Sequence, residues 1–107
     1  MAIGLRYQAI ANKQVDVVNG YATDGMISAL KLKRLKDDQN LWPPYYVVPV
    51  VRKETLDANP KIAEVLNRVS ATLDEAVMAE MNFKVDGDKM EPKDVARDFL
   101  KAKGIVK

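Results

Sequence analysis

Residues 15–25 read Val-Asp-Val-Val-Asn-Gly-Tyr-Ala-Thr-Asp-Gly, and they carry the clearest indication of the fold class. Its valine-rich start, 15–19, is typical of a buried parallel strand, which Gly20 ends. Thr23 or Asp24 can cap a following helix, because their side-chain oxygens accept hydrogen bonds from free backbone N–H groups. A strand that leads directly into a helix indicates an α/β fold with parallel strands.

The pattern on either side continues this alternation of helices and strands. Residues 5–13 are predicted to be helical, and residues 32–36 alternate apolar and basic side chains, as a half-exposed strand does. Residues 45–51 are a third β-forming run, in which Pro49 favours an edge or irregular strand. We therefore expect helices packed on a small, mostly parallel sheet.

The chain is predicted to be mainly helical after residue 52. Asn59 suits the cap of a helix that begins with a proline, and Thr72 to Glu75 match the capping box Thr-x-x-Glu. Pro92 suits the first turn of a last helix, and Gly104 is placed to stop it. The second half should therefore be one strand followed by several helices.

The composition excludes several classes of site. The chain has 107 residues, 48% hydrophobic and 30% charged, which suits one globular domain with a modest core. Without cysteine or histidine it cannot form a disulfide, a zinc site with thiolate or imidazole ligands, or a Ser-His-Asp triad. The loop 86–88 is too short for an EF-hand, so no metal is expected.

The charge and hydropathy patterns argue against two classes of partner. Seventeen basic and fifteen acidic residues are interspersed, which leaves no electrostatic footprint for nucleic acid. No apolar run approaches the ~18 residues that span a bilayer. A hydrolase or transferase is also disfavoured, because the chain has no nucleophile motif and no phosphate-cradling glycine loop.

Two tyrosines stand out because both are predicted to lie on loops. Tyr21 follows a strand and precedes a helix, at the edge where open α/β sheets bind ligands. Tyr45 follows Pro43 and Pro44, which fix an extended segment. Aromatic faces from separate loops are the usual receptor for a quaternary ammonium group. Two tyrosines make only half of such a cage. The alternative role for each is to pack against its own loop and form a local hydrogen bond.

Read in order, these motifs resemble the C-terminal part of the substrate-binding proteins of osmoprotectant ABC transporters, which take up glycine betaine, choline, carnitine and related compounds. The resemblance implies a two-lobed fold of the periplasmic-binding-protein type, which closes around its ligand by hinge motion. Residues 1–36 would end the second lobe, residues 37–44 would be the hinge crossover, and residues 45–107 would complete the first lobe. The motifs that carry the resemblance are Val15-Asp16-Val17-Val18, Tyr21-Ala22-Thr23-Asp24-Gly25, Leu35-Lys36-Asp37-Asp38, Pro43-Pro44-Tyr45, Pro49-Val50-Val51-Arg52 and Met81-Asn82-Phe83-Lys84-Val85-Asp86-Gly87.

The same resemblance implies a binding component of an importer, not an enzyme, with no cofactor. It would be extracytoplasmic, held at the membrane by an N-terminal part or a fused permease, and the permease would be its partner. Tyr21 and Tyr45 would be cage walls. Thr23 would contact a ligand carboxylate, and Asp24 would balance the charge of the cation. Helix capping is the alternative role for Thr23 and Asp24.

A structural alternative remains open. The chain could fold as an α/β fragment that binds no ligand alone. A strand that normally crosses to the other lobe could then pair with a second copy and form a swapped homodimer. Exposed sheet edges favour such association. The sequence does not rank the quaternary ammonium ligands or fix the oligomeric state.

Overall fold

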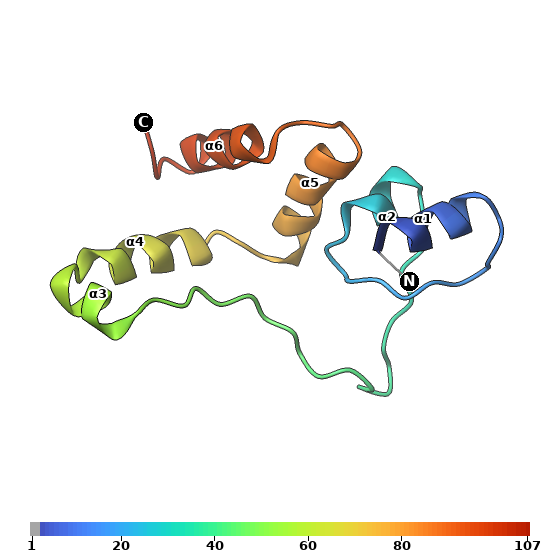
Figure 1. Ribbon diagram of the computed structural model, residues 1–107, viewed down its shortest axis with the longest axis horizontal. Coiled ribbons are helices and arrows are strands. Elements are labelled where there is room, and N and C mark those ends of the chain that lie inside the picture. Colours follow the sequence, from blue (N-terminus) through green and yellow to red (C-terminus); the bar gives the residue numbers. More distant parts are fainter. Residues whose placement is uncertain (1–2) are drawn as a thin grey trace.

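Six helices follow one another in the computed structural model, which describes residues 3–107 (Figure 1). A long extended segment separates the first two helices from the other four. The helices are α1 (Ile3–Ala11), α2 (Gly25–Ala29), α3 (Lys53–Ala58), α4 (Lys61–Ser70), α5 (Glu75–Asp86) and α6 (Pro92–Ala102).

The predicted sheet does not form within residues 3–107. The three runs 15–19, 32–36 and 45–51 carry the expected side chains, but none of them is paired into a strand. A β-strand is stabilised by the ladder that it shares with a neighbour. In Figure 1 the run 45–51 crosses open space between α2 and α3, with no second extended segment beside it. The β-forming pattern is therefore present without its partners.

The chain exposes much more surface than a compact protein of its mass. Its accessible surface is 9076 Å², whereas a folded monomer of this mass exposes about 6,000 Å². Its radius of gyration is 17.1 Å, against about 13 Å for a compact domain of this length. The excess is clearest at Val47 and Val50, which are 97% and 90% exposed. Much apolar surface therefore lacks a cover within the described residues.

The best-packed region lies where α2 meets α5 (Figure 1). Gly25, the first residue of α2, is buried there. A Cβ atom built on Gly25 would lie 2.5 Å from the backbone carbonyl of Asn82 in α5, so only glycine fits. Tyr7 and Ala9 of α1 and Val95 of α6 are the buried hydrophobic residues. Within residues 3–107 the core is therefore small, and its buried hydrophobic residues lie on helices.

Several helix ends differ from the predictions. Asn59 ends α3, and Pro60 takes the N-cap position of α4. Asp74, not Thr72, caps α5, because its carboxylate accepts a hydrogen bond from the Val77 N–H at 2.8 Å. The Thr72 hydroxyl instead donates to the Val69 carbonyl at 2.7 Å. An ionised carboxylate is the stronger acceptor, which explains why the cap moved by two residues.

The last helix agrees with its prediction. Pro92 opens α6, where its lack of an N–H group costs nothing. Gly104 follows the helix with φ +65°, in the left-handed region that glycine adopts without steric cost. Local turn chemistry was therefore sufficient to place both ends of α6.

Candidate functional site

The structure brings together the two tyrosines singled out by the sequence. The ring centroids of Tyr21 and Tyr45 are 6.1 Å apart, and the ring planes are tilted by 36°. Such spacing is typical of interacting aromatic pairs. Tyr21 comes from the loop before α2, and Tyr45 from the extended segment that follows α2. Tyr21 is 54% exposed and Tyr45 is 85% exposed, so a solute can reach both residues.

The tilted pair is suited to a cation that has no hydrogen-bond donors. Cation–π attraction operates within about 6 Å of a ring centroid. Because the two centroids are 6.1 Å apart, one cation can lie within that distance of both rings. Tyr46 is 81% exposed and, as expected for the next residue in an extended segment, is not the ring that pairs with Tyr21.

The Asp24 carboxylate faces inward, toward α1. Its Oδ2 atom accepts a hydrogen bond from the Tyr7 hydroxyl at 2.6 Å and another from the Tyr21 N–H at 2.9 Å. Asp24 stands at the N-cap position of α2 but makes no side-chain capping bond. The capping role predicted for its carboxylate is therefore wrong. A buried tyrosine hydroxyl needs a partner, and Asp24 supplies it.

Two further contacts hold the Tyr21 loop. The Arg34 guanidinium donates to the Ala22 carbonyl at 3.1 Å and also pairs with Glu75 at the start of α5. The Asn82 amide donates to the Thr23 carbonyl at 2.8 Å. Thr23 is half-buried and takes part through its backbone. A ligand contact by its hydroxyl remains a prediction.

Sequence reasoning missed Tyr7, Arg34 and Asn82. Arg34 lies in the alternating run 32–36, which predicted a strand. Tyr7 lies within the predicted helix 5–13. Asn82 lies 59 positions from Thr23, so no local pattern relates them. One available signal was Gly20. A Cβ there would lie 2.6 Å from the Tyr7 hydroxyl oxygen, which makes this glycine a mark of close approach.

The Tyr7 hydroxyl remains protonated at neutral pH. Tyr7 is 3% exposed. Burial raises the pKa of its hydroxyl well above the usual range, and the hydrogen bond to Asp24 raises it further. The hydroxyl is therefore a permanent donor to the carboxylate under ordinary conditions.

A second carboxylate organises the turn before Tyr45. Asp37 accepts hydrogen bonds from the backbone N–H groups of Leu41 at 3.0 Å and Trp42 at 2.9 Å. These bonds to Trp42 and Leu41 hold the pKa of the Asp37 carboxyl below its ordinary value. The turn fixes the direction in which the chain enters Pro43 and Pro44, and so the place where Tyr45 emerges.

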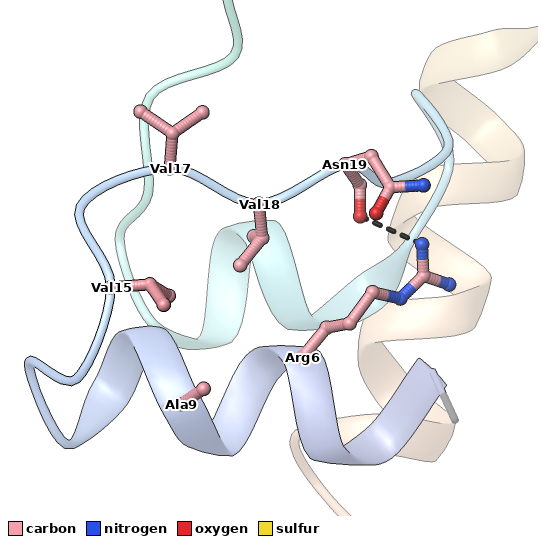
Figure 2. A pocket seen from close by; sticks show the side chains of 6 residues that line it. All are labelled: Arg6, Ala9, Val15, Val17, Val18 and Asn19. Carbon is pink, nitrogen blue, oxygen red and sulfur yellow. Dashed lines mark hydrogen bonds between the residues drawn. The ribbon is translucent and has the colours of Figure 1, made fainter. Parts of the chain in front are cut away.

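A shallow cavity of about 230 Å³ lies between α1 and the extended run 15–19. Figure 2 shows the Arg6 guanidinium reaching from α1 to the backbone of Asn19, where Nη1 donates to the carbonyl at 2.9 Å. The cavity is otherwise lined by apolar side chains, those of Ala9, Val15, Val17 and Val18. A guanidinium in an apolar wall disfavours a cationic ligand, so this cavity does not compete with the tyrosine pair.

Neither a metal cluster nor a membrane span is found in residues 3–107. These residues contain no group of three or more acidic, histidine or cysteine side chains that could hold a metal ion. No helix among them has the length and apolar character needed to cross a bilayer.

The chain is similar to characterised binding proteins. It is 39% identical over 100 residues to the carnitine transport binding protein OpuCC of Listeria monocytogenes. It is 41% identical over 101 residues to a glycine-betaine-binding protein of Pseudomonas aeruginosa. Each match covers 94% of this chain and 32% of the relative. The chain therefore spans about a third of the length of these relatives.

A solved structure gives the same relation in three dimensions. It is described as a glycine betaine/carnitine/choline ABC transporter and superimposes with a TM-score of 0.84 at 38% sequence identity. The match covers 98% of this chain and 39% of that one. This agreement explains the open shape, because the chain takes the form of one part of a larger periplasmic-binding-protein-like fold. The lobe and hinge boundaries drawn from the sequence remain predictions.

The family itself is shown by a direct match. Residues 1–102 match the family described as the substrate binding domain of ABC-type glycine betaine transport systems. This is a transport-associated binding family and not an enzyme family, in agreement with the sequence analysis. The match covers nearly the whole chain. The chain therefore belongs to the family of substrate-binding domains of ABC-type glycine betaine transport systems.

Proposed function

We propose that this chain forms part of the ligand cleft in the extracytoplasmic binding component of an ABC importer for quaternary ammonium osmoprotectants, such as glycine betaine, choline or carnitine. The observation that carries the proposal is the Tyr21–Tyr45 pair, with centroids 6.1 Å apart. The descriptions of the relatives support it, since they name carnitine and glycine betaine as ligands.

The binding mechanism rests on chemistry that suits a trimethylammonium group. This group carries charge without N–H donors, so aromatic faces attract it where hydrogen-bond acceptors cannot bind it directly. Each well-desolvated contact contributes up to about 2 kcal/mol. Tyr21 and Tyr45 provide two walls, and further walls come from polypeptide outside this chain. Thr23 contacts a ligand carboxylate where one is present. The charge-balancing role that the resemblance implies for Asp24 is an alternative to a structural role, because its carboxylate is bonded to the Tyr7 hydroxyl and the Tyr21 N–H.

Transport follows from closure of the two lobes. The hinge segment 37–44 precedes Tyr45, so a hinge rotation moves that ring relative to the Tyr21 loop. Closure excludes water and strengthens the attraction between ring and cation. The closed, loaded protein then presents its ligand to the permease of the same importer. The full protein sits at the outer face of the membrane, through an anchor or a fused permease.

Calorimetric titration with choline and with glycine betaine, carried to millimolar ligand, tests this function. In the complete protein we expect saturable binding that is nearly abolished in the double variant Tyr21→Ala, Tyr45→Ala. Tyr46→Ala is the matched control, because Tyr46 adjoins Tyr45 and is similarly exposed, at 81% against 85%. Unchanged affinity in the double variant would reject the cage.

A second candidate is self-association, which the uncovered surface favours. Val47 and Val50 are 97% and 90% exposed within a β-forming run that lacks a partner strand in residues 3–107. A second copy pairing along 45–51 would satisfy the free backbone groups and form a homodimer. Sedimentation at high concentration should then show a dimer that Val47→Lys dissociates. A mass that stays monomeric at every concentration would exclude this candidate.

A further inference from the structure

We propose that Tyr7 is a positioning residue for the proposed ligand site, whose buried hydroxyl fixes the Tyr21 wall through the Asp24 carboxylate. The inference rests on the proposed function, since it assigns a role within the same site. It also changes the role of Asp24, which becomes the link between α1 and the loop and not a direct partner of the cation.

The first step is the geometry of the shared oxygen. Asp24 Oδ2 accepts from the Tyr7 hydroxyl at 2.6 Å and from the Tyr21 N–H at 2.9 Å. The Asp24 N–H donates in turn to the Tyr21 carbonyl at 3.0 Å. Both polar backbone groups of Tyr21 are therefore bonded to Asp24. The Tyr7 hydroxyl holds the carboxylate in place through a strong, charge-assisted bond.

The second step is that the space around the hydroxyl is fitted to this bond. Tyr7 is 3% exposed. Its hydroxyl lies against Gly20, which precedes Tyr21 in the sequence, and against Asp24, which follows it. A Cβ on Gly20 would lie 2.6 Å from that hydroxyl and 3.1 Å from Asp24 Oδ2. A phenylalanine would keep the ring but lose both the oxygen atom and its bond to Asp24. The fit to an oxygen atom thus points to positioning, beyond simple packing.

The third step concerns the ligand. A wall that is already ordered loses little entropy when the ligand binds, so preorganisation raises affinity. Arg34 and Asn82 bind the carbonyls of the two residues that follow Tyr21. The backbone of Tyr21 itself is held by Asp24, and so depends on Tyr7. Loss of the hydroxyl should free the Asp24 carboxylate and loosen the Tyr21 ring.

The two roles of Asp24 predict opposite signs for Tyr7→Phe. If Asp24 is the link, the variant weakens choline binding, because the wall loses its support. If Asp24 is the counter-charge of the cation, the variant leaves affinity unchanged or raises it, because the carboxylate is released toward the ligand. Titration with choline therefore separates the two roles.

A double-mutant cycle tests whether Tyr7 acts through Tyr21. We expect Tyr7→Phe to weaken choline binding about tenfold, the equivalent of one hydrogen bond to a charged group. In a Tyr21→Ala background it should cause no further loss, because the wall is already absent. Tyr46→Phe is the matched control, since it also removes a tyrosine hydroxyl, but from a residue that is 81% exposed. Equal losses in both backgrounds, or none in the native one, would overturn the inference.

Hydrogen exchange of the ligand-free protein gives a readout that needs no ligand. The Tyr21 amide should exchange much faster in Tyr7→Phe than in the native chain, while the amides of α6 stay unchanged. An unchanged Tyr21 amide would overturn the inference. If instead Tyr21→Ala leaves choline affinity intact, the proposed function fails, and the exchange result still judges the link between Tyr7 and Tyr21.

Discussion

The Tyr21 loop and the Tyr45 segment carry the two walls of one candidate site, yet they are held in different ways. The loop is bonded to α1, to the run 32–36 and to α5. The segment 45–51 lies in the open, and within residues 3–107 no hydrogen bond holds it. One wall is therefore organised by this chain, whereas the other has no cover within residues 3–107.

The contact between α2 and α5 supports the organised wall, and breaking it should cost the most stability. Gly25→Ala would force a Cβ into the Asn82 backbone, 2.5 Å away, and should lower the free energy of unfolding by about 3 kcal/mol. Gly4→Ala is the control, because nothing lies within 4 Å of its Cβ and alanine favours a helix. Urea unfolding of both variants measures the difference. Equal stability of the two would show that α2 and α5 do not pack as described.

Two valines differ strongly in how far the chain covers them. Val95 is 5% exposed and Val50 is 90% exposed. Val95→Ala should cost about 2 kcal/mol through lost burial and a small cavity, whereas Val50→Ala should stay within about 0.5 kcal/mol. Thermal unfolding compares them. A large loss at Val50 would mean that the segment is already covered in solution, as a dimer would require.

Tyr7→Phe should lower the free energy of unfolding by about 1–2 kcal/mol, the value of a hydrogen bond to a carboxylate. The folded-state pKa of Tyr7 is raised, so its contribution is fully present below the ordinary pKa of about 10 and is lost as the pH rises further. Native stability should thus fall above pH ~10 more steeply than that of Tyr7→Phe. Urea titrations at a series of alkaline pH values check this. Identical slopes would contradict the assigned bond.

The Asp37 turn that leads to Tyr45 should respond to acid with a local change. The bonds from the Trp42 and Leu41 amides lower the pKa of the Asp37 carboxyl. These bonds therefore stabilise the turn fully at a pH above 3.8, the ordinary pKa of aspartate, and the stabilisation is lost as the pH falls through the lowered pKa. The Trp42 amide resonance should move with this titration in the native chain and not in Asp37→Asn. A resonance that ignores the pH would show that Asp37 does not hold the turn.

The sequence indicated the family, the helical regions and the tyrosine pair, but it did not predict how the walls are held. Local chemistry was enough for α6, where Pro92 and Gly104 mark the ends. The prediction of strands at 15–19, 32–36 and 45–51 was wrong for residues 3–107, because a strand forms only with a partner and these runs have none there. The relatives are about three times as long as this chain. The bond between Tyr7 and Asp24 arises from tertiary approach, to which only Gly20 pointed.

The most direct test of the central claim is nuclear Overhauser spectroscopy of choline mixed with the protein. We expect contacts from the choline N-methyl protons to the ring protons of both Tyr21 and Tyr45, and none to the ring of Tyr46. Bound choline whose methyl protons contact neither Tyr21 nor Tyr45 would contradict the account.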